Sequence, residues 1–270
     1  MKTILITGST DGIGKQTALD LAKLGHHILV HGRNEDRCKK TVSEIRNLTS
    51  NDKIDYLVAD LSSLKQVREL AASVKQKVSV LDVLINNAGV YMTHKELTED
   101  GFETTFAVNH LSVFVLTLEL LDLIKKSEKG RIITVSSIAH SRAVVNFNNL
   151  QSEQFFDSYQ SYAVSKLANV LFSVELSDRL KGTVVTSNSL HPGVITTKLL
   201  KTGFGVSGDT LEKGAATSVY LAESQDAEKV TGKYFINKMV TSSSPLTYDL
   251  TIRKKFWELS EILCGLKNEN

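Results

Sequence analysis

The sequence predicts an α/β fold, a single doubly wound parallel sheet with helices on both faces. Short apolar strands alternate with helical patterns along most of the 270 residues. These strands are nearly continuous in Val, Ile and Leu, which indicates burial on both faces and therefore parallel pairing. A glycine-rich turn joins the first strand to the first helix, and repeated strand–helix–strand crossovers wind such a sheet. Together these features are typical of a Rossmann architecture.

The elements are expected to follow one another without a break between domains. The expected strands are 3–7, 28–31, 54–59, 81–86, 131–135, 184–190 and 233–236. The expected helices are 14–24, 35–48, 63–77, 103–125, 158–174, 211–223 and about 249–266. The chain has two prolines, Pro192 and Pro245, and no low-complexity linker. We therefore predict one domain over residues 1–270.

Composition narrows the class of protein. Hydrophobic residues make up 41% and charged residues 23% of the chain, and the net charge is +2, which gives no argument for nucleic acid or a membrane surface. Cys38 and Cys264 lack the spacing of a metal site or a disulfide framework. The chain opens directly into a strand, without a signal peptide or a run of about 18 uncharged apolar residues. We expect a cytoplasmic protein with no membrane anchor, nucleic-acid partner or metal ion.

The pattern with the most chemical meaning lies in the helix that begins at Ser158. Its apolar residues recur at helical spacing, so Tyr162 and Lys166 lie one turn apart on the same face. A fixed ammonium beside a phenol favours the phenolate, so we expect the pKa of Tyr162 to fall toward the working pH. Tyr162 would then serve as a general acid or base at a carbonyl or alcohol oxygen.

The same spacing of tyrosine and lysine occurs elsewhere in the chain. Tyr91 and Tyr234 also have a lysine four residues on, but one follows a predicted strand in a loop and the other lies in a strand. A surface tyrosine and lysine on an amphipathic helix is the alternative interpretation of the pair at Tyr162. The remaining motifs decide between the two.

A glycine-rich turn after the first strand predicts a dinucleotide site. In the segment Gly8-Ser9-Thr10-Asp11-Gly12-Ile13-Gly14, Gly8 permits a tight turn, Gly12 lets the backbone approach a phosphate and Gly14 lets the helix pack on the strand. The N-terminus of the helix would then face the pyrophosphate. A second glycine pattern, 203–208, follows no strand, and we expect a mobile loop there.

The end of the second strand indicates which dinucleotide is bound. NAD sites place a carboxylate there, whereas NADP sites place a cation. Here Arg33 and Asn34 follow the strand with no acid, and Arg33 would hold the 2′-phosphate through a charge-assisted fork, with Arg37 one turn further. We therefore predict NADP(H); a solvated arginine at a helix start is the alternative.

Two further strand ends carry candidate cofactor contacts. Asp60 and Leu61 follow the third strand, where Asp60 either accepts from the adenine amino group or caps the next helix, a task that Ser62 would also fit. Asn87, Ala88 and Gly89 follow the fourth strand. Their small size would let the backbone lie close to the adenine ribose, and the Asn amides would tie neighbouring strand ends together.

Taken together, these stretches resemble the short-chain dehydrogenase/reductase family. The matching motifs occur in the family's order: 7–14, 86–89, Asn109, Ser136-Ser137, Tyr162 with Lys166, and Pro192-Gly193 with Thr197. The segments 165–172, 191–194 and 256–260 resemble the retinol-dehydrogenase-type branch. The resemblance is to that branch without the N-terminal membrane anchor that its members often carry.

The resemblance implies a role for each catalytic residue. Tyr162 would be the acid/base, and Lys166 would lower its pKa and hold the nicotinamide ribose hydroxyls. Ser137 would donate a hydrogen bond to the substrate oxygen, with Ser136 as the other candidate. Asn109, within a long helix, would hold a water that links Lys166 to solvent.

The segment after the sixth strand completes the implied cofactor site. Pro192 and Gly193 turn the chain sharply, so that the backbone at Val194 and Ile195 would pair with the nicotinamide carboxamide. The hydroxyl of Thr197 would reach the carboxamide or the nearby phosphate. His110 and His191 are expected to be structural. Family members commonly form dimers through the helices that carry Asn109 and Tyr162, so a homodimer is a further expectation.

The variable segments 138–156 and 198–210 are unusually apolar for loops. They contain Val144, Val145, Phe147, Phe155, Phe156, Leu199, Leu200 and Phe204. We expect a lipophilic pocket wall and a lid over 198–210 with its glycines as hinges; packing of these side chains on the sheet is the alternative. The apolar face of the C-terminal helix at about 249–266 is expected to pack on the domain rather than on a membrane.

These observations predict an enzyme of the NADP(H)-dependent oxidoreductase class. It would interconvert a lipophilic aldehyde or ketone and its alcohol by hydride transfer, with Tyr162 as acid/base. A catalytically silent NADP-binding regulator on the same scaffold is one alternative. A reductase of a polar carbonyl substrate, such as a sugar or an acyl-carrier thioester, is the other.

Overall fold

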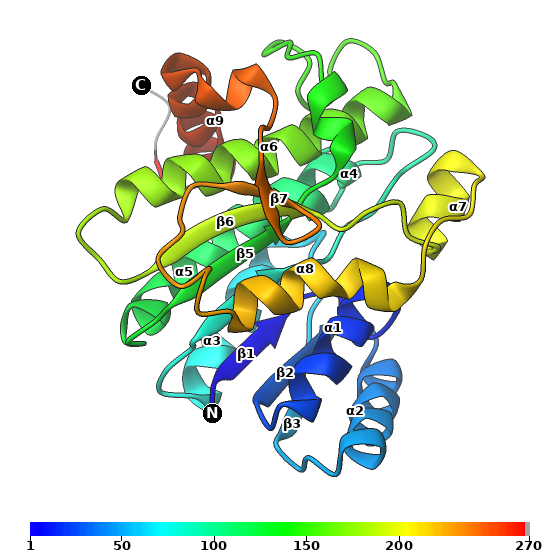
Figure 1. Ribbon diagram of the computed structural model, residues 1–270. Helices are drawn as coiled ribbons and strands as arrows, with labels where there is room; N and C mark the ends of the chain where they lie inside the picture. Colours follow the sequence, from blue (N-terminus) through cyan, green and yellow to red (C-terminus); the bar gives the residue numbers. More distant parts are fainter. Residues whose placement is uncertain (268–270) are drawn as a thin grey trace.

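A computed structural model describes residues 1–267 as one parallel sheet between two layers of helices (Figure 1). The strands are β1 (Thr3–Ile6), β2 (His27–Gly32), β3 (Ile54–Val58), β4 (Val83–Asn86), β5 (Arg131–Val135), β6 (Thr186–His191), β7 (Tyr234–Ile236) and β8 (Met239–Thr241). Their order in the sheet is β3-β2-β1-β4-β5-β6-β7-β8, and all neighbours pair in parallel except β7 and β8. The predicted doubly wound sheet is confirmed, and β8 is an antiparallel edge strand that the sequence analysis did not predict.

The helices connect the strands as crossovers. They are α1 (Gly12–Lys23), α2 (Glu35–Thr49), α3 (Leu64–Lys77), α4 (Thr104–Phe106), α5 (Ser112–Lys125), α6 (Ser158–Arg179), α7 (Lys198–Phe204), α8 (Leu211–Glu223) and α9 (Leu250–Leu263), with shorter turns η1 (Ala107–Leu111), η2 (Ile138–Arg142) and η3 (Pro245–Tyr248). α8 and β5 have the predicted bounds. α7 was not predicted, because the segment 198–210 was expected to be a loop.

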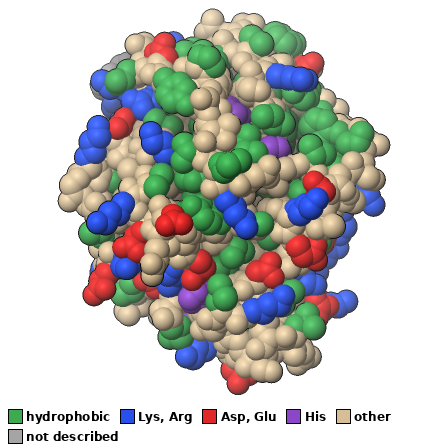
Figure 2. Space-filling view, in the orientation of Figure 1, with side chains coloured by type: hydrophobic (Ala, Val, Ile, Leu, Met, Phe, Trp, Pro, Cys, Tyr) green, Lys and Arg blue, Asp and Glu red, His purple; other side chains and the backbone are tan. Residues whose placement is uncertain are grey.

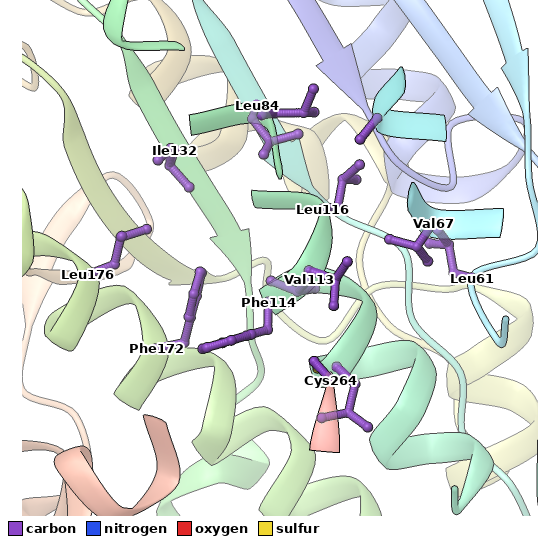
Figure 3. Packing of buried hydrophobic residues seen from close by; sticks show 14 of the residues in the cluster. Leu61, Val67, Leu84, Val113, Phe114, Leu116, Ile132, Phe172, Leu176 and Cys264 are labelled. Carbon is purple, nitrogen blue, oxygen red and sulfur yellow. The ribbon is translucent and has the colours of Figure 1, made fainter. Parts of the chain in front are cut away.

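Alternating strand residues face two separate apolar layers. Leu5 and Leu84 pack toward α3, α5, α6 and α9, whereas Ile4, Ile6 and Ile85 pack toward α1, α2 and α8. Figure 3 shows Phe114 of α5 and Phe172 of α6 in contact within the first layer, with ring centroids 5.6 Å apart. Because both faces are apolar, the sheet is buried on both sides, as the continuous hydrophobic strands predicted.

Side-chain caps fix where the helices begin. Asn34 accepts a hydrogen bond from the backbone of Arg37 at the start of α2. Ser63 accepts from the backbone of Gln66 at the start of α3. The expectation that Asp60 or Ser62 caps this helix is therefore wrong, because Asp60 Oδ1 instead accepts from both the backbone and the hydroxyl of Ser62.

The predicted helix over 103–125 is divided by a wider turn. α4 and α5 are separated by the π-helical turn η1, which contains Asn109. Among the described residues, one helical stretch, Thr104–Lys125, is long and apolar enough to cross a membrane by length and composition, with a mean hydropathy of 1.6. Its most apolar window is 78% buried inside the fold, as expected of a core helix.

The C-terminal helix α9 packs on the domain, as predicted. Trp257 stacks on Phe172 of α6, with ring centroids 5.8 Å apart, and meets Phe114 of α5 edge-on at 4.8 Å. Arg253 pairs with Asp178 of α6 at 2.9 Å. α9 lies beside α6 in Figure 1, and its Trp257 covers aromatic side chains of both α5 and α6.

Candidate active site

The carboxyl ends of the parallel strands surround a cavity of about 1580 Å³. Its walls come from the segments after β1 to β6 and from α7. The cavity collects most of the predicted site residues: Gly8, Thr10, Asp11, Gly12, Ile13, Gly14, Arg33, Asn34, Asp60, Leu61, Asn87, Ala88, Gly89, Ser137, Tyr162, Lys166, Pro192, Gly193, Val194, Ile195 and Thr197. Ser9 and Asn109 lie outside the lining.

On the face shown in Figure 2, cationic and anionic side chains are interspersed.

The glycine turn after β1 has the geometry that a phosphate cradle needs. Gly8 has a φ of 63°, and a Cβ there would lie 2.9 Å from the Cα of Ala88. A Cβ on Gly14 would lie 2.4 Å from the side-chain nitrogen of Asn87. Gly12, where α1 begins, opens into the cavity, and a Cβ there would meet only the methyl of Thr197, at 3.7 Å. The N-terminus of α1 therefore presents backbone N–H groups and its positive dipole end to the cavity, which fits a pyrophosphate.

Ser9 does not contact the cavity, contrary to the prediction. Its hydroxyl donates to the carbonyl of Ile6 at 2.7 Å and accepts from the backbone N–H of His31 at 2.9 Å. These bonds direct the side chain into the protein, where it is fully buried. Ser9 therefore holds the turn against β2, and its hydroxyl is directed away from the cavity.

His31, at the end of β2, forms hydrogen bonds to neighbouring strand ends, a structural role that the sequence did not predict. Its Nδ1 accepts from the backbone N–H of Gly8 at 3.1 Å, and its Nε2 lies 3.2 Å from the carbonyl of Ala59. Burial lowers the pKa of His31 to about 4, so the ring stays neutral and can accept from Gly8. One imidazole thus connects the ends of β1, β2 and β3.

Asn87 ties the end of β4 to the glycine turn, as predicted for the Asn amides. Its side-chain nitrogen donates to the carbonyl of Thr7 at 2.8 Å. The hydroxyl of Thr7 in turn accepts from the backbone N–H groups of Asn87 and Ala88, each at 3.0 Å. The small residues after β4 therefore lie directly against the turn that would hold a phosphate.

Lys198 of α7 forms an ion pair with Asp11 at the start of α1. Asp11 caps α1 by accepting from the backbone of Gly12, and it also pairs with Lys198 of α7. The hydrogen bond from Lys198 lowers the pKa of Asp11 despite partial burial, and Arg37 adds a smaller effect. The pair joins α7 to the glycine turn across the mouth of the cavity. No pattern in the sequence predicted that Asp11 and Lys198 form a pair.

The structure decides between the two candidate serines. Ser136 is buried, and its hydroxyl donates to the carbonyl of Lys166 at 2.7 Å. Ser137 lines the cavity beside Tyr162, and its side chain acts on the phenol by lowering the pKa of Tyr162. Ser137 is therefore the serine placed to act on a bound oxygen.

Tyr162 and Lys166 lie on one face of α6, as predicted, but the expected fall in the pKa of the phenol is wrong for the protein alone. Burial raises the pKa of Tyr162 to about 12, although the neighbouring Ser137 side chain opposes this rise. Burial also lowers the pKa of Lys166 to about 8. The Lys166 Nζ lies 5.7 Å from the centre of the phenol ring and donates to the carbonyl of Val135 at 3.1 Å. At this separation, desolvation outweighs the attraction between the two groups.

The raised pKa has a chemical consequence. Tyr162 is protonated at neutral pH and can donate its proton, as the general acid for a carbonyl must. The hydroxyl of the neighbouring Ser137 belongs to a residue that lines the same cavity.

The buried Lys166 also affects stability. Its pKa is about 8 in the fold against an ordinary 10.5, so within this window the unfolded chain binds a proton that the folded chain has released. Stability should therefore rise with pH across the window and be lower below it. A pKa shift of this size corresponds to ~3 kcal/mol.

We expect Lys166→Met to raise the free energy of unfolding at pH 7 by about 1–3 kcal/mol while it removes activity. The gain should shrink as the pH rises from 8 to 10.5, where wild-type Lys166 is neutral in the fold. Urea unfolding at several pH values measures it. Lys65→Met is the control, because the Lys65 side chain is 81% exposed and should give no gain. A less stable Lys166→Met protein at pH 7 would contradict this account.

Asn109 is buried in the π-turn η1 behind the cavity. Its Oδ1 accepts from the backbone N–H of Val90 at 2.7 Å, and its Nδ2 donates to the carbonyl of Val90 at 3.0 Å and to the hydroxyl of Ser165 at 2.9 Å. A Cβ on Gly89 would meet both Lys166 Nζ, at 3.1 Å, and Asn109 Oδ1, at 3.3 Å. Asn109 therefore lies beside Lys166 and fixes the segment after β4; its role in holding a water stays a prediction.

α7 supplies the apolar wall of the cavity. Leu199, Leu200 and Phe204 line it. The ring of Phe204 lies 6.1 Å from that of Tyr162 and 5.2 Å from that of Tyr91. A Cβ on Gly203 would lie 2.8 Å from the Tyr91 ring, so this glycine lets α7 seat closely on the aromatic group.

Part of the segment 138–156, which was predicted to form a pocket wall, lies outside the cavity. None of the side chains from Val144 to Phe156 lines the cavity. Val145 and Phe147 pack on the main core, whereas Val144 is 70% and Phe155 61% exposed. Neither the pocket wall nor the alternative, packing on the sheet, describes Phe147, which meets Phe256 of α9.

The glycines of the segment 198–210 do not all have the hinge role that was expected of them. Gly203 is fixed by the contact with Tyr91, and a Cβ on Gly208 would lie 2.0 Å from the carbonyl of Val194, so both serve close packing. Gly205 alone ends α7 in the left-handed region with open space around it. The second glycine pattern, 203–208, thus builds the end of α7 rather than a phosphate site.

Thr197 and His191 have structural partners at the rim. The Thr197 hydroxyl caps α7 by accepting from the backbone of Leu200 at 3.1 Å. His191 Nδ1 accepts from the backbone N–H of Ile138 at 3.3 Å. His110 is buried away from the cavity, with Nε2 at 2.7 Å from the hydroxyl of Ser260, as expected of a structural histidine.

Comparison with known proteins gives a consistent result. A family profile described as short chain dehydrogenase matches residues 2–206. The human protein named retinol dehydrogenase 13 is 40% identical, over 98% of this chain and 85% of its own. The human polyprenol dehydrogenase is 38% identical, over 98% of this chain and 86% of its own.

Solved structures agree with the fold. A crystal structure of an uncharacterized protein from Mycobacterium Paratuberculosis superposes with a TM-score of 0.82 at 29% identity, covering 98% of this chain and 94% of its own. A short chain dehydrogenase from Escherichia coli CFT073, complexed with NADPH, superposes with a TM-score of 0.73 at 24% identity, covering 88% and 97%.

Proposed function

The chain belongs to the short-chain dehydrogenase family and is an alcohol/carbonyl oxidoreductase of the retinol-dehydrogenase type, and we propose that it uses NADP(H) to interconvert a lipophilic aldehyde or ketone and its alcohol. One observation carries the proposal. Tyr162, Ser137 and Lys166 line the same cavity as the glycine turn at the start of α1. A proton donor, a second hydrogen-bond donor and a cradle for phosphate therefore share one space.

The residues of the cavity fit a dinucleotide, which would supply or accept the hydride. The N-terminus of α1 would bind the pyrophosphate, and the backbone after Gly193 would hold the nicotinamide end. Arg33, exposed at the end of β2 and lining the cavity, favours NADP(H), since the two positions directly after this strand hold no carboxylate. The NADPH found in a structural relative is consistent with this choice.

The chain's own part in the reaction is proton delivery and orientation. Tyr162 would donate its proton to the carbonyl oxygen during reduction and recover one from the alcohol during oxidation. Ser137 would donate a hydrogen bond to the same oxygen as charge develops on it. Lys166, whose lowered pKa eases proton exchange, would replace the proton that Tyr162 loses. α7 would cover the apolar part of the substrate and exclude water.

The wall of α7 supports a lipophilic substrate and gives a test. With NADPH, kcat/KM for unbranched aldehydes should rise by up to roughly fourfold for each added CH₂ until the wall is filled. NADPH absorbance measures the rate. Leu200→Ser should flatten this dependence, whereas Leu48→Ser, at a residue on α2 that is 68% exposed, should not change it.

The same experiment separates the alternatives. A protein that binds NADPH but reduces none of the aldehydes would be the silent regulator. A rate independent of chain length, with better turnover of polar carbonyls, would favour the polar-substrate reductase. The complete set of Tyr162, Ser137 and Lys166 in one cavity supports the enzyme.

Homodimer formation through α5 and α6 and a cytoplasmic location belong to the proposal as expectations. Trp257 of α9 contacts Phe114 of α5 and Phe172 of α6. A dimer that uses the faces of α5 and α6 would therefore have to include α9. The molar mass in solution measures this.

A further inference from the structure

We propose that His140 is a positioning residue that holds Ser137 in place for the reaction. The inference rests on the proposed function, in which Ser137 acts on the substrate oxygen. His140 is buried in η2, one turn after Ser137, and it does not line the cavity. It therefore acts through Ser137 and does not touch the substrate.

Both ring nitrogens of His140 have backbone partners. Nδ1 lies 2.7 Å from the carbonyl oxygen of Ser137, and Nε2 lies 3.0 Å from the backbone nitrogen of Ser244. A backbone N–H can only donate, so Nε2 must accept and the ring proton must sit on Nδ1. His140 therefore donates to the Ser137 carbonyl, and the neutral form is the one that satisfies both contacts. Burial, which lowers the pKa of His140, favours this form.

The His140 ring also contacts Tyr234 and Ser244, which belong to other segments of the fold. The ring packs against Tyr234 of β7, with centroids 4.7 Å apart. The carbonyl of Ser244 accepts from both the backbone and the hydroxyl of Thr247, at 2.9 and 2.7 Å, so the segment between β8 and η3 is itself held. His140 thus connects the end of β5 to a rigid element beyond the edge of the sheet.

Besides the ring of His140, the backbone N–H of residue 140 donates to the Ser137 carbonyl at 3.2 Å, and Ser137 has few further restraints. The strand β5 ends at Val135, and Ser137 lies in extended backbone at the start of η2, where its hydroxyl accepts from the backbone of Ala139 at 3.2 Å. The backbone of Ile138 donates to His191 at 3.3 Å, a second histidine contact beside the same serine. Because a displacement of about 1 Å can cost roughly 10²-fold in rate, the contact that fixes the Ser137 backbone should affect turnover.

Two amide variants separate the contacts of the ring. His140→Asn keeps a donor near the position of Nδ1 and loses the acceptor for Ser244. His140→Gln reaches the position of Nε2 and loses the side-chain donor to Ser137, while the backbone N–H of residue 140 keeps its contact with the Ser137 carbonyl. With decanal and NADPH, we expect kcat to fall by about 10²-fold in His140→Gln and His140→Phe, and by less than about tenfold in His140→Asn. The dissociation constant of NADPH should be unchanged in all three.

Controls distinguish positioning from a general loss of stability. His26→Gln removes another buried histidine, which lies at the amino end of β2 and accepts from the backbone of Lys2 at 3.2 Å. It should leave kcat unchanged even where its melting temperature falls as far as that of His140→Gln. Equal kcat values for His140→Asn and His140→Gln, or a larger loss in His140→Asn, would overturn the proposal.

A structural readout keeps the test independent of turnover. In crystals with NADP⁺, Ser137 Oγ should be displaced from Tyr162 in His140→Gln and remain in place in His140→Asn. If the wild-type protein reduces no decanal, the proposed function is in question, but the crystal structures still decide the role of His140. An unmoved Ser137 in His140→Gln would overturn that role.

Discussion

Replacing Tyr162 with phenylalanine is expected to lower kcat by about 10²–10⁴-fold, the usual contribution of a positioned general acid. The change removes one oxygen, and with it the proton for the substrate. The ring remains, so its contacts with Tyr91 at 5.4 Å and with Phe204 at 6.1 Å should persist. Turnover of a long-chain aldehyde with NADPH measures the loss.

Cofactor binding provides the internal comparison for Tyr162→Phe. The affinity for NADPH should stay within about threefold of wild type, because phosphate binding rests on the glycine turn and Arg33. Tyr220→Phe is the matched control, since Tyr220 lies on α8 outside the cavity and packs against Phe235. If Tyr162→Phe keeps more than a tenth of wild-type turnover, the general acid is a different group.

Replacing Arg33 with aspartate is expected to reverse the choice of cofactor. A 2′-phosphate would lose one or two charge-assisted hydrogen bonds and meet a like charge, so kcat/KM for NADPH should fall by roughly 10²-fold or more. The new carboxylate stands where NAD sites bind the ribose hydroxyls, so kcat/KM for NADH should rise. Initial rates with both cofactors and one aldehyde measure the change.

A charge-matched variant tests whether position or net charge is responsible. Lys40→Asp makes the same change of charge on α2, outside the cavity, and should leave the preference for NADPH intact. Equal loss in the two variants would mean that the general field of the surface, not a contact from Arg33, selects the cofactor. An unaltered preference in Arg33→Asp would show that NADP(H) selection lies elsewhere, with Arg37 as the nearest cation in the cavity wall.

The sheet and the cofactor turn were predictable because local sequence and tertiary structure agree there. Gly8 and Gly14 must be glycine for steric reasons that the backbone alone imposes, since a Cβ at either would lie within 3 Å of another atom. Strands such as β4 carry apolar residues on both faces, a pattern that is typical of a buried parallel strand. The pair of Tyr162 and Lys166 follows from helical spacing once the helix is recognised.

The predictions were wrong where packing between segments distant in the sequence determines the surroundings of a side chain. The face that Phe147 contacts depends on α9, more than a hundred residues away, so an apolar loop residue and a pocket residue look the same in sequence. Ser9 looked like its neighbours in the glycine turn, but its hydroxyl is directed inward by the backbone of His31. The pKa of Tyr162 depends on how deeply α6 is buried, which spacing along one helix does not show.

Two histidines show what kind of signal was missing. His31 precedes Gly32 at the carboxyl end of β2, an edge where buried polar residues have structural or functional roles, and this position was a usable signal. His140 has no comparable signal, because its partner Ser244 lies 104 residues further along the chain. Only the fold shows that the two segments meet.

The most direct test of the central claim is a crystal structure of the protein with NADP⁺ and a long-chain alcohol. The account predicts that the alcohol oxygen lies within hydrogen-bond distance of both the Tyr162 hydroxyl and the Ser137 hydroxyl, with the chain of the alcohol along α7. An alcohol oxygen bound to other side chains, with the Tyr162 hydroxyl directed away from it, would contradict the account.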